Sequence, residues 1–182
     1  MSNYNMDVFV EQLVKKKIST KDILIYVGIF LAGTVIIFAG IFLLLPLTGQ
    51  FAISFFVLVG TIFGAYYLLS RRNLEYEYAV TNGDVSVDKI INRKSRKRLT
   101  SFDAKTIEEM GKYAENAEKL KNRRVDKRIF ASAYEDGRDS IYVIAQSKKT
   151  GLTLIVFNPD ERVLDAIKPY VQRYLRNEFF GR

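Results

Sequence analysis

A run of 48 consecutive residues without a charged side chain, from Ile23 to Ser70, constrains this chain more than any other feature. The segment 46–50 divides the run into apolar stretches at 23–45 and 51–69, which contain 23 and 19 residues. An α-helix needs about 20 mainly apolar residues to cross the hydrocarbon core of a bilayer. The sequence therefore predicts a two-helix transmembrane hairpin over residues 23–70.

Two other interpretations of this run fit less well. A buried helix of a soluble protein normally keeps a polar stripe, whereas the first stretch contains only Tyr26 and Thr34 as polar side chains. A cleaved signal peptide has a shorter apolar region that ends in small residues, and here a second apolar stretch follows almost at once. We therefore expect an integral membrane protein.

Basic residues flank the run on both sides. Lys15, Lys16, Lys17 and Lys21 precede it, Arg71 and Arg72 follow it, and the connection 46–50 carries no charge. By the positive-inside rule, both termini are expected in the cytoplasm, with the hairpin in the cell membrane as a multi-pass anchor.

Small residues recur within the two predicted spans. Gly60 and Gly64 form a G-x-x-x-G pattern, and Gly28 with Ala32 offers a matching small face on the first span. Such residues let helices approach closely in lipid. They either pack the two spans against each other or mediate homo-oligomerisation, and the sequence leaves both open. Transport by the hairpin alone is not expected, because neither span contains an ionisable residue of the kind that marks ion pathways.

The segment 1–22 precedes the first span. Apolar side chains at Phe9, Val10, Leu13 and Val14 recur at helical spacing, which predicts a cytoplasmic amphipathic juxtamembrane helix. After it, Ser19, Thr20 and Asp22 are typical of a helix N-cap.

Beyond the hairpin, residues 73–182 have the length and composition of one small domain. Segments 74–80 and 85–91 alternate in polarity around Asn82-Gly83, which indicates a β-hairpin. Further strands are predicted at 98–102, 128–134, 140–146 and 152–157, while 106–113 suits a strand or a short helix. A C-terminal helix is predicted over 159–178, with Asn158 as its cap and a kink or break at Pro169. The expected class is α+β: a two-helix transmembrane hairpin followed by an antiparallel domain of six or seven strands, capped by one helix.

This plan is that of a pleckstrin-homology domain. The two spans, the stretch LEYEYAVTNGDV at 74–85, the basic strand pair at 94–98 and the terminal Asn158-Pro159-Asp160 helix resemble bacterial two-span membrane proteins with a C-terminal pleckstrin-homology-like (PH-like) domain. Those families are domains of unknown function. The resemblance implies a fold and a location, and it brings no catalytic residues with it.

A basic cluster is the candidate contact site for an anionic lipid headgroup or a protein partner. It comprises Arg93, Lys94, Arg96, Lys97 and Arg98. Phosphoinositide-binding domains that the fold resembles carry basic residues around the first hairpin, where this chain has Asp84. Any headgroup site is therefore expected to be displaced to the second hairpin. A solvated turn is the alternative interpretation of the cluster.

Several function classes find no support in the sequence. The chain has no His and no Cys, which removes the commonest general base, thiol nucleophiles and nearly all zinc sites. We expect no catalytic site, no metal and no cofactor. A second basic group is interrupted by acidic residues and lacks a recognisable nucleic-acid module, so nucleic acid is not expected as a partner; it comprises Lys119, Lys121, Arg123, Arg124, Lys127 and Arg128.

The sequence thus predicts a non-enzymatic, membrane-anchored binding or scaffolding module. It would recruit a protein or an anionic lipid headgroup at the cytoplasmic membrane face. The alternative is an accessory subunit of a larger membrane complex for transport or secretion, contacting that complex through the hairpin.

Overall fold

The computed structural model describes residues 8–181 and divides the chain into two compact units. One unit, residues 18–73, is a helical hairpin. The other is a β domain built from the residues on both sides of that hairpin.

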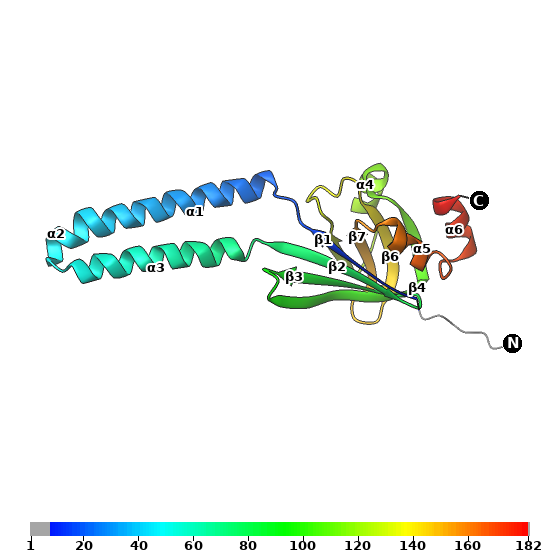
Figure 1. Cartoon of the computed structure of the whole chain (residues 1–182). Helices are drawn as coiled ribbons and strands as arrows, with labels where there is room; N and C mark the ends of the chain where they lie inside the picture. The colour runs from blue at the N-terminus through cyan, green and yellow to red at the C-terminus, as the bar shows by residue number, and fades with distance from the viewer. Residues whose placement is uncertain (1–7, 182) are drawn as a thin grey trace. The chain divides into compact units, whose positions relative to one another are not determined.

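The first arm of the hairpin is one continuous helix from Thr20 to Thr48. It comprises α1 (Thr20–Ala39), a π-helical segment η1 (Gly40–Leu44) and α2 (Leu45–Thr48). The second arm is α3 (Phe51–Ser70), coloured green-cyan in Figure 1. Both arms are long and apolar enough to cross a membrane. In the most apolar 18-residue stretch of each arm, only 6% is buried.

The connection between the arms is shorter than predicted. The helix continues through Pro46, and only Gly49 and Gln50 connect the arms, with Gly49 in the left-handed conformation (φ 63°). Proline lacks an N–H and its ring crowds the carbonyl of the preceding turn. The wider π-helical turn immediately before Pro46 accommodates both effects.

The two ends of the hairpin are fixed to each other. Ser19 caps α1 in a capping box with Asp22, as the sequence predicts. The nearly buried Asp22 carboxylate also pairs with the guanidinium of Arg72, which follows α3. This ion pair joins the start of one arm to the end of the other.

The β domain is one seven-stranded sheet in the order β1-β2-β3-β4-β6-β7-β5. All neighbouring pairs are antiparallel except β5 and β7. The strands are β1 (Phe9–Lys15), β2 (Leu74–Thr81), β3 (Asp84–Ile91), β4 (Ser95–Lys112), β5 (Lys127–Ala131), β6 (Ile141–Ser147) and β7 (Gly151–Phe157). The mostly antiparallel PH-like plan is confirmed, and 106–112, which suited a strand or a helix, belongs to the long strand β4.

The N-terminal segment is not the predicted amphipathic helix. Residues 9–15 form β1, which pairs with β2 from Phe9↔Thr81 to Lys15↔Glu75. The side chains of β1 alternate between exposed and half-buried, as a strand at the sheet edge requires. The domain therefore begins before the hairpin, and the predicted boundary at residue 73 is wrong. Residues 1–7 of the predicted segment lie outside the described residues.

The sequence predicts a single C-terminal helix, whereas the structure has two short helices in that region. The stretch 159–178 contains α5 (Glu161–Ile167) and α6 (Arg173–Phe180), separated around Pro169. The predicted break is confirmed, but the cap is Asp160, whose carboxylate accepts from the Val163 N–H at 2.9 Å. Between β4 and β5, α4 (Tyr113–Lys121) packs Leu120 into a second, smaller core cluster.

Tyr78 is fully buried in the main core, and its hydrogen bonds link β2 to the end of β5 and to the residue that follows β7. Its hydroxyl donates to the Ala131 carbonyl of β5 and accepts from the Asn158 N–H at 3.3 Å, and its ring packs edge-on against Phe157. Burial raises the pKa of Tyr78 well above its ordinary value, so the hydroxyl keeps its proton.

Replacing Tyr78 with Phe should destabilise the domain, because the Ala131 carbonyl and the Asn158 N–H lose their buried partner. We expect a loss of about 1–3 kcal/mol in the free energy of unfolding. Pulse proteolysis of the full chain in urea measures it. Tyr174→Phe is the matched control, since that hydroxyl bonds the Glu108 carbonyl from a side chain that is 56% exposed. Equal effects of the two substitutions would contradict this assignment.

Candidate binding surface

The outer face of strands β1 to β4, opposite the main core, carries a broad depression. Its floor is formed by three small side chains in register across neighbouring strands, Ala79, Ser86 and Ser101. Larger side chains surround it, including the exposed Phe9 and Glu11 of β1. The depression encloses about 860 Å³.

Ion pairs run along one side of this face. The carboxylates of Glu75, Glu77 and Asp88 are nearly buried, and each is paired with an arginine at the β3–β4 end of the sheet. The pairs are Glu75–Arg93 at 3.2 Å, Glu77–Arg96 and Asp88–Arg98. A buried carboxylate needs such a partner because desolvation penalises its charge.

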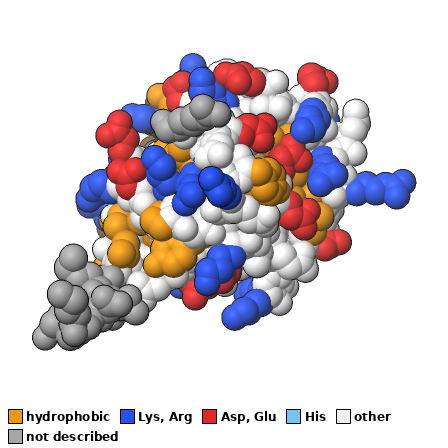
Figure 2. All heavy atoms as spheres, turned by 90° about the vertical axis from the view of Figure 1, so that its right-hand side faces the viewer, with side chains coloured by type: hydrophobic (Ala, Val, Ile, Leu, Met, Phe, Trp, Pro, Cys, Tyr) orange, Lys and Arg blue, Asp and Glu red, His pale blue; other side chains and the backbone are white. Residues whose placement is uncertain are grey.

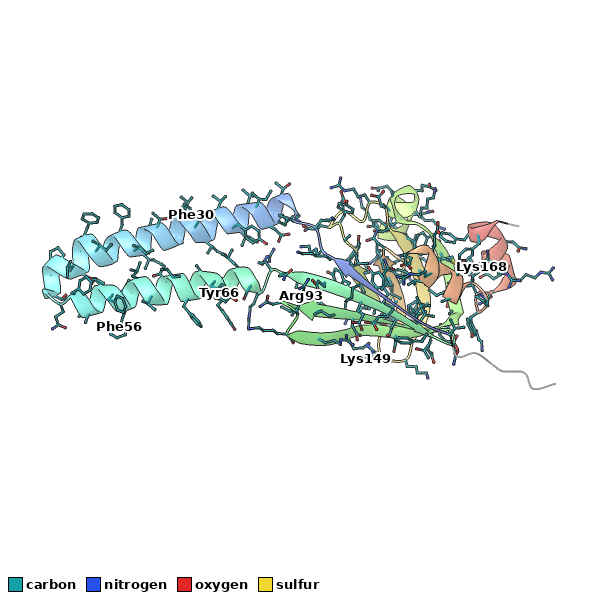
Figure 3. The ribbon with its side chains drawn as sticks, viewed as in Figure 1. Phe30, Phe56, Tyr66, Arg93, Lys149 and Lys168 are labelled. Carbon is teal, nitrogen blue, oxygen red and sulfur yellow. The ribbon has the colours of Figure 1, made fainter. Side chains whose placement is uncertain are left out.

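The predicted basic cluster is therefore not a free group of five cations. Arg93, in the β3–β4 turn (Figure 3), and two arginines of β4 neutralise carboxylates of the same domain. Lys94 and Lys97 are exposed, and no carboxylate among residues 8–181 lies within ion-pair distance of either. The three arginines of the cluster thus form a ladder of ion pairs within the domain. Of the cluster, the two lysines are available to bind an external anion.

Three carboxylates on this face, those of Glu11, Asp84 and Asp103, have no basic partner within ion-pair distance among the described residues. Glu11 of β1 lies close to the Glu77 carboxyl, and each arginine nearby already belongs to another acid. Burial raises the pKa of Glu77, the Glu11 charge raises it further, and Arg96 opposes both. Carboxylates on this face therefore outnumber the arginines that pair with them.

The second basic group, which the sequence shows to be interrupted by acids, is partly neutralised by acidic side chains in the structure. Lys119 bonds Glu109 at 2.5 Å and Lys121 bonds Glu118 at 2.5 Å. Partial burial favours a higher pKa for the Glu109 carboxyl, but hydrogen bonds from Lys119 and the Tyr142 hydroxyl outweigh it, so this pKa lies below its ordinary value. Figure 2 shows basic and acidic side chains interspersed over the face of the molecule that lies on the right in Figure 1.

The predicted small face of the hairpin lines an apolar groove. Gly28, Ala32, Gly60 and Gly64 lie along this groove, which encloses about 660 Å³. A Cβ built on Gly28, Gly60 or Gly64 would meet no other atom within 4 Å among the described residues. These glycines lie on one side of the hairpin but do not make its close contacts.

Other residues make those contacts, and the G-x-x-x-G pattern does not include them. A Cβ on Gly40 would lie 3.0 Å from Val57 Cγ1, and one on Gly33 would lie 3.6 Å from Thr61 Cγ2. The Ser54 hydroxyl also donates to the Gly40 carbonyl at 2.8 Å. Gly40 stands just where the π-helical segment begins, so the helix irregularity and the close approach coincide. The signal available in the sequence was the presence of polar side chains, Ser54 and Thr61, within the second predicted span.

A metal site would need several ligating side chains close together. Within residues 8–181, no group of three or more acidic side chains could hold a metal ion. The geometry instead offers a contoured, charged sheet face suited to contact with another molecule.

Fold and face together define a PH-like domain that carries a long apolar helical hairpin between its first two strands. The family described as "Bacterial PH-like domain (DUF6106)" matches residues 6–177, and the chain belongs to it. The match begins before the hairpin. The PH-like domain therefore includes residues on both sides of the hairpin, whereas the resemblance implied a domain in the C-terminal part alone. No curated protein and no solved structure matches the chain significantly.

Removing an arginine from the ladder should cost stability, whereas removing a neighbouring lysine should not. Arg98→Gln leaves the buried Asp88 carboxylate unpaired. We expect a loss on the order of 1–2 kcal/mol, less than for a fully buried pair because water screens the half-exposed guanidinium. Lys97→Gln is the control. Urea denaturation of the two variants measures the difference, and equal stability would show that the ladder is not structural.

Enlarging Gly40 should disturb the hairpin, whereas enlarging Gly60 should not, because only Gly40 faces the other arm at contact distance. Overpacking of this kind costs about 1–3 kcal/mol. A Gly33→Cys, Thr61→Cys pair in this cysteine-free chain reports the approach of the arms through its rate of disulfide formation. We expect Gly40→Leu to slow that rate and Gly60→Leu to leave it unchanged. The reverse order would make Gly60 the packing residue.

Proposed function

We propose that this protein is a non-enzymatic, membrane-anchored module that binds a protein partner at the cytoplasmic face of the cell membrane. The observation that carries the proposal is the depression on the outer face of β1–β4, with its small floor and charged surround. Concave surfaces with a few convergent polar groups are the usual places where proteins take up other molecules.

Anchoring is supported by the surface of the hairpin. Phe30 and Phe56, labelled in Figure 3, are 72% and 71% exposed, and apolar side chains dominate both arms. A soluble monomer rarely exposes an apolar surface of this size. Since β1 and β2 belong to one sheet, the segments before and after the hairpin lie on the same side of the membrane, and the flanking lysines and arginines favour the cytoplasm.

Short links connect the β domain to the hairpin. Four residues separate β1 from α1, and three separate α3 from β2. A chain of that length spans roughly 10–18 Å at most. A partner bound by the β domain would therefore be recruited to the membrane surface.

An anionic lipid headgroup is the less favoured ligand. Arg93, Arg96 and Arg98 are occupied by acids of the domain, which leaves Lys94 and Lys97 as the cations of the cluster. Each lysine near an anionic surface contributes about 1 kcal/mol, so these two would support orientation at the membrane rather than selective headgroup binding.

A second candidate function is that of an accessory subunit in a larger membrane complex. It is favoured by the open apolar groove at Gly28, Gly60 and Gly64, which another transmembrane helix could fill. The same groove would serve homo-oligomerisation.

Crosslinking and affinity capture from native membranes test these candidates with four versions of the full chain. Ser101→Trp fills the depression, and Ser95→Trp, on the same strand but outside it, is the matched control. The third version carries an unrelated hairpin, and the fourth is unaltered. We expect the partner to be captured by all except Ser101→Trp. Capture that survives Ser101→Trp but is lost with the exchanged hairpin would instead support the subunit.

A further inference from the structure

The edge of the sheet at β1 has unused backbone hydrogen-bonding groups. In an antiparallel pair, alternate residues bond the neighbouring strand, and those between point their N–H and C=O away from it. Bonds from Asn82 to the Val8 carbonyl and from Lys16 to the Leu74 carbonyl show that the even-numbered residues face β2. Phe9, Glu11, Leu13 and Lys15 therefore direct their backbone groups outward.

Nothing in residues 8–181 bonds these outward groups. Outward bonding resumes only after the strand, where the Lys17 N–H donates to the Ala133 carbonyl at 2.7 Å. At the opposite edge, the Tyr78 hydroxyl binds the carbonyl of Ala131, the last residue of β5. Natural edge strands are usually shielded by prolines, bulges or inward charges, since an open edge pairs readily with another strand. β1 has no proline, and its charged side chains are limited to Glu11 and Lys15.

The side chains beside this open edge have a definite pattern. The residues with outward backbone groups also place their side chains on the outer face, in the order apolar, acidic, apolar, basic. Phe9 and Leu13 are 63% and 58% exposed. Between them lies Glu11, a carboxylate without a basic partner among the described residues, beside Glu77, whose own cation is Arg96.

We propose that β1 is a docking strand, and that its partner is an extended polypeptide segment with a Lys or Arg flanked two residues away on each side by apolar residues. The added strand would bond the outward groups of Phe9, Glu11 and Leu13. Its basic side chain would lie opposite Glu11, and its apolar side chains would lie opposite Phe9 and Leu13. This inference rests on the proposed function and names the partner's chemistry.

A second copy of β1 fits this edge less well. Antiparallel pairing centred on Glu11 would place two glutamates opposite each other, and like charges directly opposite are destabilising. Pairing centred on Leu13 would match Glu11 with Lys15, but it would also set Phe9 opposite Lys17, whose N–H is already bonded. A separate segment with a central basic residue matches Phe9, Glu11 and Leu13 together.

The test uses the full chain in lipid nanodiscs and the peptide Thr-Val-Thr-Lys-Thr-Val-Thr, whose pattern is the same in both chain directions. Amide hydrogen exchange at Glu11 and Leu13 is the readout, with Gln12, already bonded to β2, as the internal control. We expect millimolar peptide to slow exchange at Glu11 and Leu13 only. A peptide with Glu in place of Lys should bind roughly three- to tenfold more weakly.

Two variants separate side-chain recognition from backbone pairing. Glu11→Lys should reverse the preference between the Lys and Glu peptides. Leu13→Pro removes one outward N–H without removing a bond to β2 and should abolish binding of both, whereas Leu13→Thr keeps the amide and should retain binding. The charge reversal keeps the test decisive if the proline variant does not fold.

Unchanged exchange at Glu11 and Leu13, or the same peptide preference in Glu11→Lys, would overturn the docking strand. The proposed function fails separately. If Ser101→Trp abolishes capture of the native partner while Leu13→Pro does not, the depression binds a partner and the edge does not.

Discussion

The pairing of β1 with β2 is the interaction on which the rest of the structure depends. Seven residue pairs join a strand that precedes the hairpin to a strand that follows it. The helical hairpin is therefore an insertion within a β-hairpin. Loop-closure entropy grows only slowly with loop length, and two helices that pack against each other bring the ends of the insertion together. The pair places both links to the hairpin at neighbouring positions, Lys15 and Glu75.

Electrostatics then shape the outer face. The sheet buries three carboxylates at positions where a strand would ordinarily carry apolar or exposed polar side chains. Their charges are tolerated because arginines from the β3–β4 end reach back to them. Two consequences follow: the basic cluster is largely neutralised within the domain, and one of the unpaired acids, Glu11, lies at an open edge. Small side chains on the neighbouring strands leave the depression beside it.

Local patterns predicted most of the sheet and both arms of the hairpin, because alternation, Asn-Gly turns and uncharged length are properties of short segments. The segment 9–15 shows where this fails. Apolar residues at Phe9, Val10, Leu13 and Val14 fit one face of a helix and also the two faces of a strand. Only the distant partner β2 decides between them, and no local pattern contains that information.

The candidate site was predicted less well for a similar reason. A run of basic residues is visible in the sequence, whereas its neutralisation depends on strand register that brings Arg93 beside Glu75 and Arg96 beside Glu77. The helix-packing residues likewise depend on how the arms rotate about their axes. Gly60 and Gly64 match a packing motif, yet Gly40 and Ser54 face the other arm.

A cross-strand disulfide tests the central claim most directly. Glu11 and Ala79 are opposite each other in β1 and β2, at a pair without mutual backbone hydrogen bonds, where Cα atoms lie closest. The structure predicts that Glu11→Cys with Ala79→Cys forms a disulfide rapidly in the full, otherwise cysteine-free chain, and that Glu11→Cys with Ser101→Cys does not. Failure of the first pair to crosslink in folded protein, or equal crosslinking of both, would contradict the insertion of the hairpin between β1 and β2.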